Sequence, residues 1–156
     1  MKKILLTLLC LPIICFGQKT YVPDDNFENY LESNGMGDGI TLNDSVYTNN
    51  IYLVNILLLN NMNISDLTGI EDFISLNYLE CNDNLLTSLD LSNNIVLYNL
   101  YCYKNQLTSL DVSNNNSLIY LYCDSNQLTT LDVSGVTSLT HFYCSFNQIT
   151  SLDLTQ

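Results

Sequence analysis

Hydrophobic and polar residues recur in a fixed order, with a period of twenty-one, through the second half of this chain. Four copies of the pattern LxxLxCxxNxLTSLDLS occupy residues 76–96, 97–117, 118–138 and 139–156, and the last copy stops three residues short. A looser copy over residues 57–75 sits one position further from the next copy than the regular period requires. Because one such unit cannot bury its own apolar face, the repetition predicts a solenoid whose coils stack on one another.

The alternation inside each copy predicts a short strand. Leu79 and Cys81 flank Glu80, so the first two share one face and Glu80 points to the other. Equivalent strands of successive copies are expected to form a parallel sheet above columns of apolar residues. The predicted columns are Leu79, Leu100, Leu121 and Phe142; Leu86, Leu107, Leu128 and Ile149; Leu89, Leu110, Leu131 and Leu152; Leu91, Val112, Val133 and Leu154; and Leu76, Leu97, Leu118 and Leu139.

The common pattern resembles the leucine-rich repeat, LxxLxLxxNxL, with Cys in place of the third Leu. Its length and its TSLDLS second half are similar to the internalin-like repeats of secreted bacterial surface proteins. The resemblance covers residues 57–156, and YVPDDNFENYLE and NISDLTGIEDF resemble the lead-in of such proteins. It implies a leucine-rich-repeat solenoid, mostly β. The concave face would carry the parallel sheet, the convex segments would be short and strand-like, and a small helical cap would cover the N-terminal end.

The pattern divides the chain into three parts. Residues 1–17 read as a secretory signal peptide, with Lys2 and Lys3 ahead of an apolar run over residues 4–15. Lipid attachment at Cys15 is an alternative, although Ile14 stands where a small residue is needed. Residues 18–50 are the predicted cap, with an amphipathic helix over 24–32, and residues 51–156 are the repeat domain of four to five repeats. We therefore expect a secreted or cell-surface protein.

Residues 51–60 (IYLVNILLLN) are apolar but too short to cross a membrane, and they predict a buried strand region. No second apolar run long enough to span a membrane follows the signal peptide. The last repeat has no cap, and an uncovered strand edge invites association. Two interpretations are open: the sequence is part of a longer chain, or the chain associates end to end.

Four cysteines fall at one inward position of successive copies: Cys81, Cys102, Cys123 and Cys144. Neighbours are expected about 4.8 Å apart, the spacing between strands. Side chains stacked in register point the same way, whereas a disulfide needs them to turn toward each other. Four ligands along a line cannot converge on one zinc ion. Buried free thiols are the favoured interpretation, and one or two disulfides or a bound metal are the alternatives.

Two polar columns are interpreted as structural. Asn84, Asn105, Asn126 and Asn147 can pair the backbone groups of their own coil and of the next. Asp90, Asp111, Asp132 and Asp153 can each accept an N–H bond from the turn that follows, as in an Asx turn. No cofactor is predicted. Calcium along this acidic row, or at residues 34–39 around Asp38, is the alternative.

Charge and motif content narrow the function. The chain has 16 acidic residues, 4 Lys and no Arg, which argues against nucleic-acid binding and against attraction to anionic membranes. The only histidine, His141, has Asp124 and Ser145 in adjacent columns. A flat, solvated sheet gives such a trio no shielded pocket or oxyanion hole, so we predict no enzyme.

The outward strand positions hold six of the 11 tyrosines, together with acidic residues and the histidine. A rigid tyrosine-rich strip offers contact area and hydroxyl groups to a protein or a polysaccharide. The predicted function is an adhesion-type binding module. The alternative is a structural spacer whose tyrosines only stabilise the sheet through cross-strand contacts. The predicted ligand-binding residues are Tyr78, Glu80, Tyr101, Tyr103, Tyr120, Tyr122, Asp124, His141 and Tyr143.

Overall fold

The computed structural model describes residues 17–152. The predicted signal peptide therefore lies outside the described residues except for Gly17, and so do Asp153 and Leu154 of the predicted columns. Within residues 17–152, no helix combines the length and the apolar character that crossing a membrane requires.

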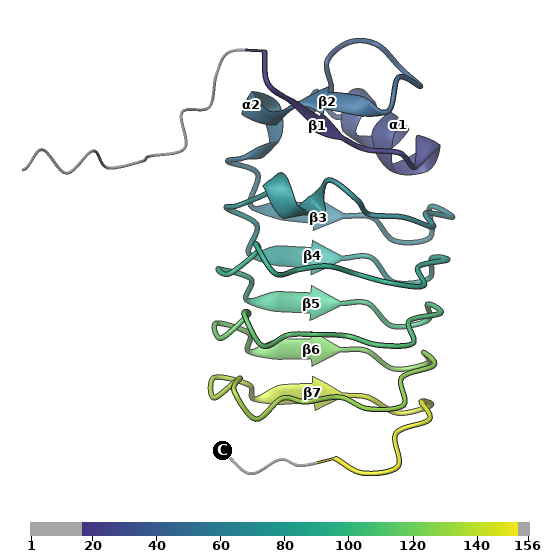
Figure 1. Ribbon diagram of the computed structural model, residues 1–156, viewed down its shortest axis with the longest axis vertical. Helices are drawn as coiled ribbons and strands as arrows, with labels where there is room; N and C mark the ends of the chain where they lie inside the picture. Colours follow the sequence, from purple (N-terminus) through teal and green to yellow (C-terminus); the bar gives the residue numbers. More distant parts are fainter. Residues whose placement is uncertain (1–16, 153–156) are drawn as a thin grey trace, which may run out of the picture.

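A parallel five-stranded sheet runs along the stacked coils, one strand per coil (Figure 1). Leu57, Leu79, Leu100, Leu121 and Phe142 lie opposite one another in the register of this sheet. The step along the chain is one position longer for the first pair than for the others, as the sequence predicts. The leucine-rich-repeat solenoid is confirmed. Its strands are β3 (Ile56–Leu58), β4 (Tyr78–Glu80), β5 (Asn99–Tyr101), β6 (Tyr120–Tyr122) and β7 (His141–Tyr143).

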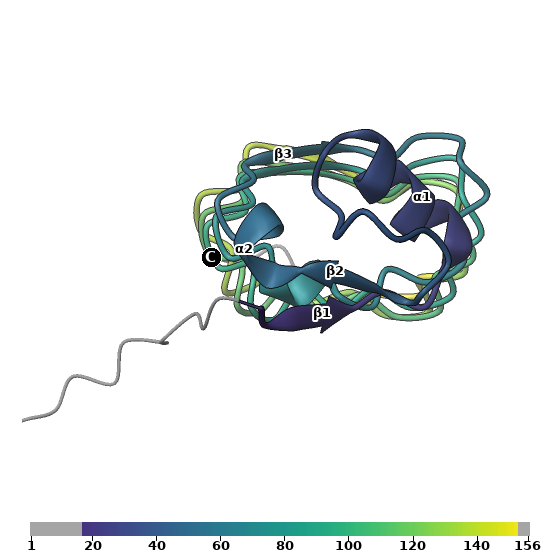
Figure 2. The ribbon, with the colours of Figure 1, turned by 90° about the horizontal axis from the view of Figure 1, so that it is seen from above.

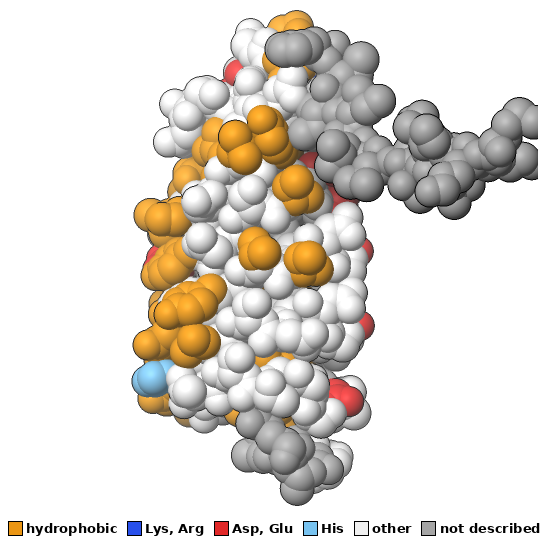
Figure 3. All heavy atoms as spheres, turned by 90° about the vertical axis from the view of Figure 1, so that its left-hand side faces the viewer, with side chains coloured by type: hydrophobic (Ala, Val, Ile, Leu, Met, Phe, Trp, Pro, Cys, Tyr) orange, Lys and Arg blue, Asp and Glu red, His pale blue; other side chains and the backbone are white. Residues whose placement is uncertain are grey.

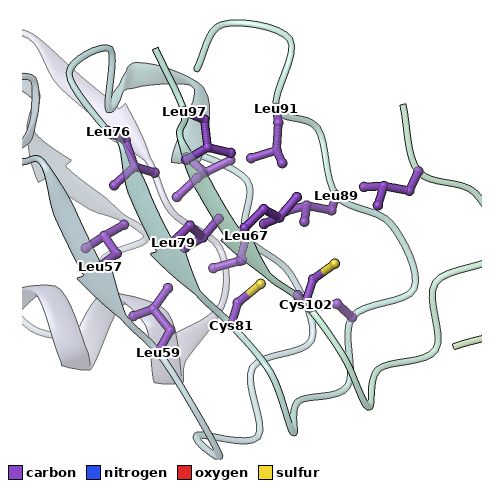
Figure 4. Close-up of a cluster of buried hydrophobic side chains, with 14 of the residues drawn as sticks. Leu57, Leu59, Leu67, Leu76, Leu79, Cys81, Leu89, Leu91, Leu97 and Cys102 are labelled. Carbon is purple, nitrogen blue, oxygen red and sulfur yellow. The ribbon is translucent and has the colours of Figure 1, made fainter. Parts of the chain in front are cut away.

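Beneath the sheet, the predicted columns form one continuous core, in which equivalent leucines of successive coils lie side by side (Figure 4). The column residues of the earlier coils are buried, whereas Leu139, Phe142, Ile149 and Leu152 of the last described coil are half-buried. Each coil buries its apolar residues against the equivalent residues of its neighbours.

The cysteine column is confirmed as a row of free thiols, three buried and one, Cys144, half-buried. The sulfurs of Cys81 and Cys102 point the same way (Figure 4). Burial raises the pKa of the Cys81 thiol to about 12. A thiol of that kind stays protonated and unreactive at neutral pH, so these cysteines act as small apolar core residues.

Within residues 17–152, the second half of each coil is not part of a sheet. Leu89 and Leu91 are buried on either side of the exposed Asp90. Asp90 Oδ1 accepts a hydrogen bond from the Ser92 N–H at 2.9 Å. The same bond recurs from Ser113 to Asp111 and from Ser134 to Asp132, which confirms the predicted Asx turns.

The first asparagine column closes the turn after each strand. Asn105 Nδ2 donates to the carbonyl oxygens of Cys102 (3.1 Å) and Tyr103 (3.4 Å) in its own coil, and of Cys81 (2.9 Å) in the preceding one. Its Oδ1 accepts the Leu86 N–H at 3.1 Å. The prediction that these asparagines also bond to the next coil is wrong. Their amides project back toward the preceding coil.

The N-terminal residues cover one end of the coils (Figures 1 and 2). Helix α1 (Asp25–Ser33) begins after Asp24, whose Oδ1 accepts the N–H groups of Asn26 and Phe27, so the predicted helix is confirmed to within one residue. Asp24 Oδ2 accepts the Ser65 N–H of the first coil at 2.8 Å. The Phe27 ring packs 6.2 Å from that of Phe73.

An antiparallel ribbon completes this cap. It consists of β1 (Lys19–Tyr21) and β2 (Ser45–Tyr47), which pair with each other, followed by the short helix α2 (Thr48–Ile51). Thr20 Oγ1 donates to Asp72 at 2.5 Å, which joins the ribbon to the 3-10 helix η1 (Ile70–Asp72) of the first coil.

The buried strand predicted over residues 51–60 is wrong in extent. Residue Ile51 ends α2, and only residues 56–58 form a strand. Leu57 and Leu59 are buried, but Ile56 and Leu58 are exposed because successive side chains of a strand point to opposite faces.

Candidate binding face

The strands present three rows of side chains on the side of the sheet that faces away from the core, called here the sheet face. Each row is named after one residue and follows the register of β3 to β7. The Tyr101 row is Leu58, Glu80, Tyr101, Tyr122 and Tyr143; the Tyr120 row is Ile56, Tyr78, Asn99, Tyr120 and His141; and the Tyr103 row is Asn82, Tyr103, Asp124 and Ser145.

The Tyr101 row contains a stack of three rings. The centroids of Tyr101 and Tyr122 lie 4.8 Å apart with an interplanar angle of 25°, and those of Tyr122 and Tyr143 lie 4.6 Å apart at 17°. Parallel strands in register impose this spacing, because it matches the distance between neighbouring strands. The stack therefore presents ring edges and hydroxyl groups to solvent, while the faces between neighbouring rings are covered.

The Tyr120 row is interrupted. Tyr120 stacks on His141 at 4.4 Å and 22°. The next position holds Asn99, which is buried and donates from Nδ2 to the Tyr101 hydroxyl at 3.2 Å. The Tyr78 hydroxyl on its other side donates to Glu80 Oε1. This hydrogen bond, together with burial, raises the pKa of Tyr78 above its usual range, so Tyr78 remains a neutral donor.

The Tyr103 row borders the turn where the chain leaves the strand. Lys104 Nζ lies 5.9 Å from the centre of the Tyr103 ring and 3.2 Å from Asp83 Oδ1. Asp124 Oδ1 accepts the Ser145 N–H of the next coil at 2.9 Å. The nine predicted residues thus do lie together on one face, in three adjacent rows.

The geometry gives no support to a catalytic trio at His141. Its Nδ1 lies 2.8 Å from the Thr140 hydroxyl, and Asp124 accepts from the backbone of Ser145. Among residues 17–152, no hydrogen bond joins His141 to Asp124 or to the Ser145 side chain.

Sequence reasoning missed several exposed apolar residues beside the rows. Tyr98 is 47% exposed, and its ring centroid lies 6.3 Å from that of Tyr120. Ile56 and Leu58 lie opposite Tyr78 and Glu80, so they add the first coil to two of the rows. Aligning the first copy to the next with a step of twenty-two residues could have predicted this. Hydrophobic side chains, tyrosines included, form a band along the molecule that ends at the histidine (Figure 3). No lysine is visible on this side.

An open depression of about 810 Å³ lies within this band. It extends over the coils of β3 to β6 at the end where the chain enters the strands. Its lining residues are Ile56, Asn77, Tyr78, Val96, Tyr98, Asn99, Ser117 and Tyr120.

Carboxylates gather in the cap, away from the sheet face. Oxygens of Asp25, Glu28 and Asp44 lie within 4.8 Å of one another, a cluster that the sequence analysis missed. Glu28 is buried and accepts the N–H groups of Asn43 and Asp44, so the fold itself uses this carboxylate. In residues 34–39, for which calcium was the alternative, Asp38 Oδ2 forms an ion pair with Lys19 Nζ at 2.6 Å.

Solved structures share this architecture. The functional domain of InlJ from Listeria monocytogenes, described as including a cysteine ladder, matches 88% of this chain with 37% identity and a TM-score of 0.79. An internalin of the same organism, InlF, matches 84% with 20% identity and a TM-score of 0.68. A leucine-rich-repeat protein of Leptospira interrogans matches 64% with 28% identity and a TM-score of 0.53.

The chain is therefore an internalin-like leucine-rich-repeat protein in its fold. It spans 31% of the InlJ domain's length, 46% of the InlF chain and 27% of the Leptospira chain. No protein-family model matches it. No curated protein matches it either.

Proposed function

We propose that this chain is a secreted or cell-surface binding module that recognises a protein or a polysaccharide through its tyrosine-rich sheet face. The observation that carries the proposal is the pre-ordered Tyr101 row, whose rings are held at 4.6–4.8 Å by the register of the sheet. A face ordered before binding loses little conformational entropy when a partner arrives. Aromatic residues with hydroxyl groups also suit recognition surfaces.

The similarity to internalin-like structures supports a role in protein interaction at or beyond the bacterial surface. The acidic composition supports the same view, because it disfavours nucleic acids and anionic lipids as partners. The signal peptide predicted over residues 1–17 supports export. The end-to-end association predicted for the last repeat is a separate proposal, which light scattering at increasing protein concentration checks.

The stacking itself favours a second candidate. Rings that contact each other on neighbouring strands stabilise a sheet without any ligand. A structural spacer within a larger surface protein would need no more than this.

A triple variant separates the two candidates. Tyr101→Ser, Tyr122→Ser and Tyr143→Ser together remove the stack, and Tyr21→Ser with Tyr47→Ser removes two exposed tyrosines of the cap as a matched control. Residues 18–156 of each protein are screened on protein and glycan arrays, with and without a chelator, and their unfolding temperatures are recorded. We expect the triple variant alone to lose its ligand while remaining folded. A screen that finds no ligand, or a triple variant that loses only stability, favours the spacer. A ligand that all three proteins bind equally contradicts the role of the Tyr101 row.

A further inference from the structure

We propose that the depression at Asn99 receives an apolar side chain of a polypeptide whose flanking residues are basic. This inference rests on the proposed function, and it names the class of partner and the place where that partner is anchored.

The depression exists because one ring is missing from the aromatic positions between Tyr78 and His141 of the Tyr120 row. Tyr78 and Tyr120 project from β4 and β6, and Asn99 occupies the same position on β5 between them. Asn99 is buried and its amide is tied to the Tyr101 hydroxyl at 3.2 Å, so it lies low on the sheet. The gap between two rings is therefore fixed by the register and does not depend on a mobile loop.

The walls of the depression are apolar and face solvent. Ile56 is 56% exposed, Val96 44% and Tyr98 47%. Each of these three side chains leaves apolar surface in contact with water that a partner would cover. Asn77, Asn99 and Ser117 add a few polar groups, the mixture that orients a ligand in an apolar site.

Ring geometry disfavours a sugar stacked between the rings of the Tyr101 row. Stacking on a sugar needs a free ring face, but Tyr101 and Tyr122 cover each other at 4.8 Å, and Tyr122 and Tyr143 at 4.6 Å. Tyr120 is covered at 4.4 Å by His141 on the side away from Asn99. Beside the depression remain the sides of Tyr78 and Tyr120 that face Asn99, together with aliphatic side chains, and these suit an apolar side chain.

The negative charge of the sheet face favours a partner with basic residues on either side of its apolar side chain. Glu80 and Asp124 lie on the sheet face and Asp83 lies at its border, whereas Lys104 is the only lysine or arginine of the described coils and already pairs with Asp83. An acidic surface of this kind attracts Lys and Arg and repels acidic partners. Glu80 also contacts Tyr78, which lines the depression, so the negative charge lies beside the anchor position.

Synthetic peptides test the proposal directly. Short fluorescent peptides carry one central Leu, Phe or Trp between lysines and arginines. One matched set has Ser at the centre, and another has Glu in the flanks. Fluorescence polarisation with residues 18–156 measures affinity at low and at high salt. We expect the basic peptides with an apolar centre to bind, the Ser set to bind roughly tenfold to hundredfold more weakly, the Glu set not to bind, and added salt to weaken binding.

Two variants and one control locate the site. Asn99→Tyr places a ring in the gap and should abolish peptide binding without removing any core residue, and Val96→Ser should weaken binding through the wall. Ile95→Ser changes a neighbouring exposed residue outside the lining and should leave the affinity unchanged. Circular dichroism and unfolding temperatures establish that each variant is folded. If Asn99→Tyr does not fold, Val96→Ser against Ile95→Ser decides.

Several results overturn this inference. One is that no peptide binds, another is that peptides bind equally with Ser at the centre, and a third is that Val96→Ser and Asn99→Tyr bind as well as the unchanged protein. Dimers in sedimentation that Asn99→Tyr abolishes would assign the depression to a second copy of the chain instead. A glycan or protein ligand that depends on the Tyr101 row but is indifferent to Asn99→Tyr would leave the proposed function standing and remove this inference alone.

Discussion

The inside and the outside of the same strands follow different rules. At the inward position, β4, β5 and β6 all carry leucine, namely Leu79, Leu100 and Leu121. One residue earlier on the same strands, the outward side chains are Tyr78, Asn99 and Tyr120. A column packed in register accepts only apolar side chains of similar volume, whereas solvent accepts side chains of any size and polarity. Departures from the repeat on the sheet face are therefore where specificity can be encoded, and Asn99 is the clearest of them.

The interior contains two asparagine columns whose side chains differ in how completely they are hydrogen-bonded. Asn105 uses both its oxygen and its nitrogen. In the turn of the second half, Asn94 and Asn115 donate from Nδ2, but within residues 17–152 their buried Oδ1 atoms have no hydrogen-bond partner. The next copy has Val136 at this position. Burial alone therefore does not require asparagine at a position. Asparagine is required where backbone groups would otherwise stay unpaired, as at Asn105.

The largest expected effect tests the contrast between inside and outside. Leu86 is fully buried, while its neighbour Leu85 is 45% exposed. Leu86→Ala should lower the free energy of unfolding by about 2–5 kcal/mol, because it leaves a cavity in a packed column. Leu85→Ala is the control and should cost less than about 1 kcal/mol. Urea unfolding followed by circular dichroism measures both, and equal losses would contradict the column description.

The second largest effect is expected for Asn105→Ala, which should lower the free energy of unfolding by about 2–4 kcal/mol. It leaves the buried Leu86 N–H without its acceptor and removes three N–H···O bonds to Cys81, Cys102 and Tyr103. Chemical denaturation gives the magnitude. Hydrogen exchange at the Leu86 amide gives the location, and unchanged protection there would refute the assigned bond.

Asn115→Val should change stability by less than about 1 kcal/mol, in either direction. The carbonyl oxygens of Leu91 and Asn94 that accept from Asn115 also accept backbone N–H groups, so they stay paired in the variant. The substitution also removes a buried oxygen without a partner. The same denaturation measurement applies. A loss as large as that of Asn105→Ala would erase the distinction between the two columns.

The smallest effect concerns the exposed acidic row. The N–H of Ser113 stabilises the charged carboxylate of Asp111 and lowers its pKa below the usual 3.8. Since this pKa is lowered in the folded state, the carboxylate stabilises the protein above pH 3.8 and stops doing so as the pH falls through the lowered value. Asp111→Asn should therefore unfold slightly earlier than the unchanged protein at neutral pH, and the difference should vanish in acid. Thermal unfolding from strongly acidic to neutral pH checks this, and a difference that persists at the acid end would contradict it.

Periodicity was sufficient to predict the sheet, the core columns and the rows of the sheet face, because stacked coils place equal positions opposite one another. It did not predict that Tyr98 and Val96 border a depression, since their exposure depends on how the chain turns before each strand. It also placed the second partner of Asn105 in the wrong coil, because the sequence does not show the direction in which an amide projects.

The sequence by itself determined which residues are equivalent: its constant period fixes the strand register, the buried thiols and the tyrosine rows, because parallel strands repeat at a constant distance. Only the tertiary structure decided which contacts hold the N-terminal cap on the coils and where the sheet face is hollow. Contacts such as those of Thr20 with Asp72 or of Asp24 with Ser65 join segments that lie far apart in the chain and share no repeat. Such contacts depend on side-chain packing in three dimensions, which a one-dimensional period cannot specify.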